Sequence, residues 1–99
     1  MAHHSARKAD ADLDDIWFYV ANESGSMDVA NRLIDSITDQ FLLLARHPYL
    51  GRPRDDEFGV GSRSLAVGQY VVVYCLEDRD VLILRVVHGR RDIESIFED

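Results

Sequence analysis

One apolar run in this chain must lie inside the fold, and it ends in a cluster of charged residues. Residues 81–87 read VLILRVV, and six of the seven are β-branched or bulky aliphatic side chains, the composition of a strand buried on both faces. Arg85 interrupts the run, and its burial is costly unless the guanidinium finds a partner or water. The next residues, 88–92, read HGRRD. The sequence therefore predicts a core strand whose end carries the functional chemistry.

Two segments upstream have the apolar spacing of amphipathic helices. Within residues 9–20 and again within 30–45, apolar side chains recur at intervals of three and four, which predicts two helices, the first of about three to four turns. Residues 22–26 break the first pattern, and Ser26 is the expected N-cap of the second helix. Pro48 ends the second, because it disfavours helical dihedrals in the preceding residue.

After Pro48 the helical spacing of apolar residues ends. Glycine and proline residues recur in the stretch that follows, which predicts loops. Residues 2–5 are a further candidate for an edge strand. We expect one domain over residues 1–99, of the α+β class, with the N-terminal helical hairpin packed on a small antiparallel β-sheet. Alternating apolar patterns and a polar turn at 77–80 predict strands at 63–67, 69–76 and 81–88.

Charge and composition narrow the function classes. The net charge of −7 argues against direct nucleic-acid binding by this chain alone, which would need several cations on phosphates at once. Arginines are concentrated after residue 45, so an acidic partner is possible there. The single Cys75 fits a reducing compartment. Without a long apolar stretch or a signal peptide, we expect a cytoplasmic protein with no membrane contact.

The candidate target-binding residues are cationic and lie on or just beyond the predicted strands. For two groups a plainer role is also open: Arg85 and His88 could cap the sheet end by bonding to backbone carbonyls, and residues 90–92 could form a solvated ion-pair cluster. We assign no catalytic residue and expect neither metal nor cofactor, because no nucleophile stands beside a base and no metal-ligand pattern is evident. The five candidates are Arg63, Arg85, His88, Arg90 and Arg91.

A series of motifs along the chain resembles the ParE branch of the RelE/ParE toxin superfamily. They cover nearly the whole chain in order, and they are specific together although each is weak alone. The motifs are Ala9-x-x-Asp12-Leu13-x-x-Ile16-x-x-Tyr19-Val20-Ala21, then Ala30 and Arg32, Leu44-Ala45-x-His47-Pro48-x-x-Gly51-Arg52, Gly61-x-Arg63-Ser64, Tyr70-x-x-x-Tyr74, and Ile83-Leu84-Arg85-Val86-Val87-His88-Gly89-Arg90-Arg91-Asp92.

This resemblance implies the toxin of a bacterial type II toxin-antitoxin module of the kind that stabilises plasmids, with a RelE/ParE-like fold. It implies neutralisation by a small ParD-like antitoxin encoded beside the toxin. For ParE-like toxins the implied target is DNA gyrase, whereas for RelE-like relatives it is messenger RNA in the ribosome.

Three hypotheses about the activity remain open. RNA cleavage needs an acid or base and cations at the phosphate, but the strand at 69–74 reads QYVVVY, Lys8 is the only lysine, and Gly89 stands where such relatives have tyrosine. We therefore expect a gyrase inhibitor that acts by protein-protein binding. The alternatives are a ribosome-dependent endoribonuclease, using a cluster of Arg63, Arg85 and His88, and a degenerate module that only binds antitoxin.

Overall fold

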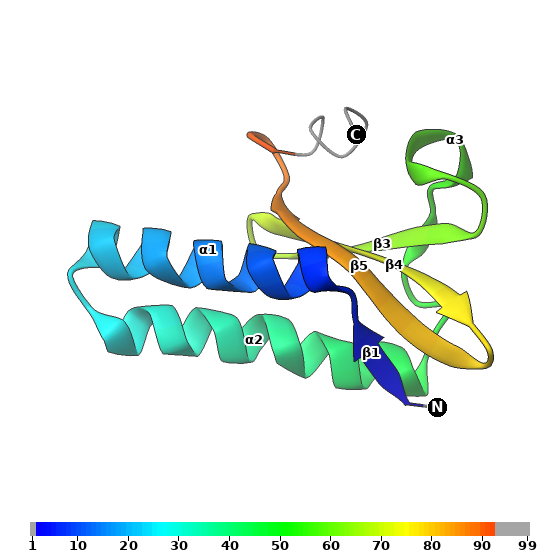
Figure 1. Ribbon diagram of the computed structural model, residues 1–99, viewed down its shortest axis with the longest axis horizontal. Coiled ribbons are helices and arrows are strands. Elements are labelled where there is room, and N and C mark those ends of the chain that lie inside the picture. The colour runs from blue at the N-terminus through cyan, green and yellow to red at the C-terminus, as the bar shows by residue number, and fades with distance from the viewer. Residues whose placement is uncertain (1, 93–99) are drawn as a thin grey trace.

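A pair of helices packs on one face of a five-stranded sheet (Figure 1). The computed structural model describes residues 2–92. The predicted α+β class, a helical hairpin on a small sheet, is confirmed. In chain order the elements are β1 (His3–Ser5), α1 (Arg7–Ser24), α2 (Met27–Arg46), β2 (Arg52–Pro53), α3 (Asp55–Phe58), β3 (Ser62–Val67), β4 (Tyr70–Glu77) and β5 (Asp80–His88).

The helix boundaries follow from local capping chemistry. Helix α2 begins as predicted, because the Ser26 hydroxyl accepts a hydrogen bond from the Val29 N–H (3.2 Å). It ends before Pro48, with His47 already outside helical dihedrals. Helix α1 is longer than predicted and runs to Ser24, so placing a break from residue 22 was wrong. The helix ends at Gly25, which has the left-handed φ of 67° that glycine adopts without strain.

The sheet has the strand order β1-β5-β4-β3-β2. Its antiparallel part is as predicted, and Asp78 and Arg79 form the β4–β5 turn with positive φ values of 50° and 71°. The expectation that the whole sheet is antiparallel was wrong for β1, which pairs parallel to β5. Such pairing is possible because a long connection, which runs from α1 through β4, separates the two strands. The prediction of loop alone after Pro48 missed β2 and α3, which are too short to show a period.

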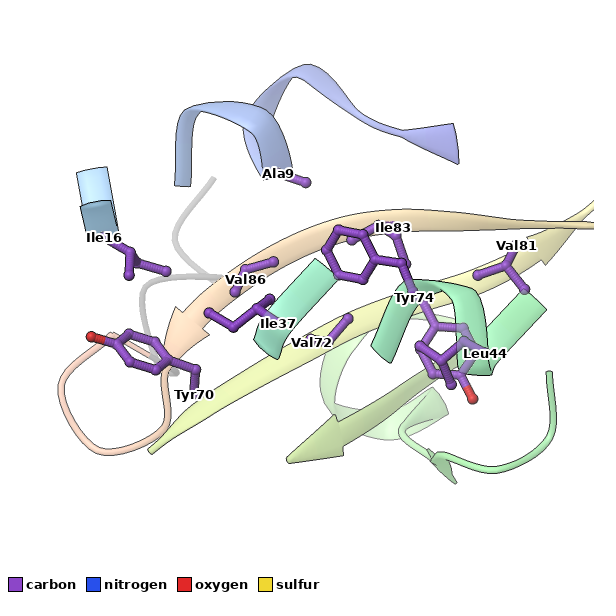
Figure 2. Packing of buried hydrophobic residues seen from close by; sticks show 11 residues of the cluster. Ala9, Ile16, Ile37, Leu44, Tyr70, Val72, Tyr74, Val81, Ile83 and Val86 are labelled. Atoms are coloured by element: carbon purple, nitrogen blue, oxygen red, sulfur yellow. The ribbon is translucent and has the colours of Figure 1, made fainter. Parts of the chain in front are cut away.

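The core lies between the helical hairpin and the inner face of β4 and β5 (Figure 2). Ile37 from α2 and Ile83 from β5 are fully buried there. One face of β5 is buried in the core, whereas Leu82 and Leu84 on its other face are only half-buried. The prediction of a strand buried on both faces is therefore confirmed only in part. Leu84 has no partner in the β4–β5 register, where Val73 pairs with Arg85 and Tyr74 with Ile83. This bulge changes which way the residues after Ile83 face.

Candidate functional site

Arg85 lies beside the bulge and forms an ion pair with Asp12 of α1. Its Nε donates to Asp12 Oδ2 (2.8 Å) and its Nη2 to Asp12 Oδ1 (3.1 Å), the two-bond geometry that makes arginine-carboxylate pairs strong. The side chains are 21% and 14% exposed, respectively. The guanidinium thus has the partner that its burial requires. This partner is a carboxylate, whereas the plainer interpretation of the sequence suggested backbone carbonyls.

Asp12 also bonds to the sheet backbone, because its Oδ2 accepts from the Val86 N–H (2.9 Å). One carboxylate therefore fixes α1 to β5 through both a side chain and the main chain. Reasoning from sequence did not assign Asp12 this role. A signal was present: Asp12 lies among Ala9, Leu13 and Ile16 on the apolar side of α1, where an acidic residue needs a partner.

Arg63 of β3 supports the connection that leads from α2 into the sheet. Its Nε donates to the Gly51 carbonyl (2.8 Å) and its Nη2 to the Tyr49 carbonyl (3.1 Å). The guanidinium also lies 5.3 Å from the centroid of the Tyr49 ring. These contacts fix the connection and give Arg63 an internal structural role.

The Tyr74 hydroxyl bonds to the same connection from inside the core. It donates to the Pro48 carbonyl (2.8 Å) and accepts from the Gly51 N–H (2.9 Å). Tyr70 and Tyr74 both pack in the core, because residues four apart on a strand share one face, and the Tyr74 hydroxyl lies inside the fold. A Cβ at residue 51 would stand 2.6 Å from the Ser64 carbonyl oxygen and 2.7 Å from Tyr74. The His-Pro-x-x-Gly-Arg motif is therefore a structural joint, and only glycine fits at position 51 of it.

His88 caps a turn at the end of β5. Its Nδ1 accepts hydrogen bonds from the backbone N–H groups of Arg90 and Arg91, both at 3.2 Å. Nδ1 must then be unprotonated, so the ring hydrogen is on Nε2, which lies 3.3 Å from Gln69 Oε1 and donates to it. His88 therefore caps backbone donors and not the carbonyls that the sequence suggested.

Arg90 and Arg91 follow this turn and are exposed. Arg90 lines a hollow of about 470 Å³ together with Gln69 and Tyr70. The Arg91 guanidinium lies 4.7 Å from the centroid of the Tyr19 ring on α1. Burial raises the pKa of Tyr70 above its usual value, while the positive charge of Arg91 acts in the opposite direction.

The structure brings three of the five candidates together. His88, Arg90 and Arg91 form what we call the strand-end cluster. Arg85 shares with His88 a smaller hollow of about 250 Å³, which carboxylates of α1 also line. Arg63 lies elsewhere: it pairs with Tyr74, four residues along β4 from the partner of His88, or about 13 Å along the sheet.

Within residues 2–92, no group of three or more histidine, cysteine, aspartate or glutamate side chains is arranged to hold a metal ion. In the same residues, neither of the two long helices is both long enough and apolar enough to cross a bilayer.

Comparisons with known proteins agree with the motifs. A family described as the ParE toxin of the type II toxin-antitoxin system parDE matches residues 5–93. Toxin ParE1 of Caulobacter vibrioides is 40% identical over 86 residues, which are 84% of this chain and 83% of that protein. Toxin ParE3 of the same organism is 34% identical over 89 residues, 90% of this chain and 87% of that protein.

Solved structures of related systems have the same fold. The chromosomal ParDE toxin-antitoxin system from P. aeruginosa matches with a TM-score of 0.77 and 25% identity over 89% of this chain and 95% of that chain. The toxin-antitoxin complex RelBE2 from Mycobacterium tuberculosis matches in fold, with a TM-score of 0.65 and 24% identity over 88% of each chain. The resemblance seen in the motifs is confirmed: this chain belongs to the ParE toxin family of type II toxin-antitoxin systems.

Proposed function

We propose that this toxin inhibits DNA gyrase in the cytoplasm by protein-protein binding, and that Arg90 and Arg91 of the strand-end cluster contact gyrase. The observation that carries the proposal is the difference in burial and hydrogen bonding among the four candidate arginines. Arg63 and Arg85 are held by internal hydrogen bonds, whereas Arg90 and Arg91 are exposed beyond the last core strand. Exposed cations of this kind steer association and pair with acidic groups of a partner.

A ribosome-dependent endoribonuclease is the second candidate, and one observation favours it: Arg85 and His88 line a common hollow. Two features weigh against it. The Arg85 guanidinium is already paired with Asp12. The hollow is also lined by Asp15 and Asp92, whose negative charges disfavour a phosphate.

The test compares the toxin with its Arg90→Glu, Arg91→Glu variant in two assays. DNA supercoiling by purified gyrase should be inhibited by the toxin and not by the variant, while translated message should remain intact with both. The variant should unfold at nearly the same urea concentration as the toxin, because exposed residues contribute little to stability. Message cleavage without gyrase inhibition would favour the second candidate, and a variant that still inhibits gyrase would remove the cluster from the mechanism. A chain inactive in both assays that still binds antitoxin would be the degenerate module.

We also propose that a ParD-like antitoxin neutralises the toxin and that the module stabilises the replicon carrying it. Large apolar side chains are exposed on both helices and on the loop after α2, for example Phe18 (62%), Leu42 (58%) and Tyr49 (71%). Their separation fits a segment that wraps around the toxin and folds as it binds. Coexpression with the adjacent antitoxin should give one complex at micromolar concentration, and elution as separate proteins would contradict this.

A further inference from the structure

We propose that His88 is a positioning residue: its ring holds Arg90 and Arg91 in place for the target and does not itself contact the target. This inference rests on the proposed function, which gives the two arginines their role. It changes the role that the sequence suggested for His88 from target binding to support.

The contacts that the His88 ring already makes leave it little freedom to bind a target. Nδ1 accepts from the N–H groups of Arg90 and Arg91, while Nε2 bonds to Gln69. The ring also packs edge-on against Tyr70, with centroids 5.5 Å apart. The Asp92 N–H donates to the His88 carbonyl (3.0 Å), which closes the same turn through the main chain. Both polar atoms of the imidazole thus have partners within the described chain.

The pattern of these bonds matches a motif usually made by a different residue. Asparagine and aspartate at the start of a turn accept, through Oδ1, from the backbone N–H groups two and three residues later. His88 does the same through Nδ1, with Arg90 and Arg91 as donors. Nδ1 of histidine and Oδ1 of asparagine are separated from Cβ by the same number of bonds. An asparagine can therefore replace the cap although it lacks an imidazole.

The turn determines where the two guanidinium groups go. Two residues after the cap, Arg90 borders the hollow beside Gln69, and the next residue, Arg91, lies over the Tyr19 ring of α1. A loosened turn would let both side chains sample many directions. Binding would then have to order both side chains, and the conformational entropy lost in doing so weakens the complex without removing any charge.

The experiment compares His88→Asn with His88→Gln. Glutamine places its amide one bond further out, near the position of Nε2, where its NH₂ group can donate to Gln69 Oε1, so it keeps the contact with Gln69 but not the cap. Loss of a cap should speed hydrogen exchange of the Arg90 and Arg91 amides about fivefold in His88→Gln and leave it near the wild-type rate in His88→Asn. Inhibition of gyrase should follow the same order, with asparagine restoring activity that glutamine does not. Ring ¹⁵N shifts of wild-type His88 should report a neutral ring with hydrogen on Nε2.

Two results would overturn the inference. In the first, His88→Asn keeps both amides protected but is as inactive as His88→Gln, so the imidazole itself is needed at the target. In the second, the two variants exchange these amides at the same rate, so Nδ1 is not the cap. If wild-type toxin does not inhibit gyrase, the proposed function fails, while the exchange rates and ring shifts still decide whether His88 positions the turn.

Discussion

The Asp12–Arg85 pair is predicted to be the polar contact that contributes most to holding α1 on the sheet. We consider Asp12→Ala, Arg85→Ala and the double variant. Asp12→Ala leaves the guanidinium without its carboxylate and the Val86 N–H without its acceptor, whereas Arg85→Ala leaves Asp12 still bonded to that N–H. The first substitution should therefore cost more than the second.

The magnitude follows from burial. Breaking a fully buried pair costs about 3–5 kcal/mol, and exposures of 21% and 14% reduce this through solvent screening. We expect Asp12→Ala to lower the free energy of unfolding by about 3 kcal/mol and Arg85→Ala by about 2 kcal/mol. The double variant should lose less than the sum, with a coupling of about 1–2 kcal/mol, because neither charge is then left alone.

Urea denaturation measures these differences, with the slope of the transition checked for equality among the variants. Asp14→Ala is the matched control, since Asp14 is exposed on the same helix, and it should change stability by less than about 0.5 kcal/mol. If Asp12→Ala behaved like this control, or if the two single losses simply added, the pair would not hold α1 to the sheet as described.

Two further predictions concern the joint after α2 and the edge strand β1. Gly51→Ala should cost about 2–3 kcal/mol in urea unfolding, because its Cβ would stand 2.6 Å from a backbone oxygen; a cost as small as that of exposed Arg52→Ala would contradict this. The Ala2 N–H, and then His4, hold the pKa of Asp80 below its usual value, so this stabilisation is present above the unfolded pKa and is lost as pH falls through the folded one. After correction for the intrinsic exchange rate at each pH, the protection of β1 amides should therefore fall below about pH 4 in the wild type, and Asp80→Asn should lack that transition.

Local signals made much of this fold predictable. The apolar spacing of both helices, the Ser26 cap and the Pro48 stop act within one turn of the chain, so the sequence contains them directly. The bond from Arg85 to Asp12 spans 73 positions, and nothing near Arg85 indicates which acidic residue it meets. The parallel pairing of β1 likewise depends on where the helical hairpin returns the chain, which no short pattern encodes.

The sequence predicted which residue types make up the candidate site, but not what each residue does there. Cationic residues on the strands predicted a basic surface, yet Arg63 and Arg85 bond internally, to carbonyls and to a carboxylate. Both residues have an aliphatic stem and five donors, which suit a buried joint as well as a binding surface. Only burial and partner geometry separate the two uses, and both come from tertiary structure.

The end of β5 divides residues that hold the fold from residues free to meet a partner. Val86 and Val87 are in the core, and Arg85 is paired with α1, so substitutions up to this point act on stability. Arg90 and Arg91 are exposed, so substitutions there change the surface without opening the core. His88 lies between the two groups, with its ring against Tyr70 and its Nδ1 on the turn. Loss of toxicity without loss of stability is therefore expected from His88 onward and not before it, which separates binding defects from folding defects within the seven residues from Arg85 to Arg91.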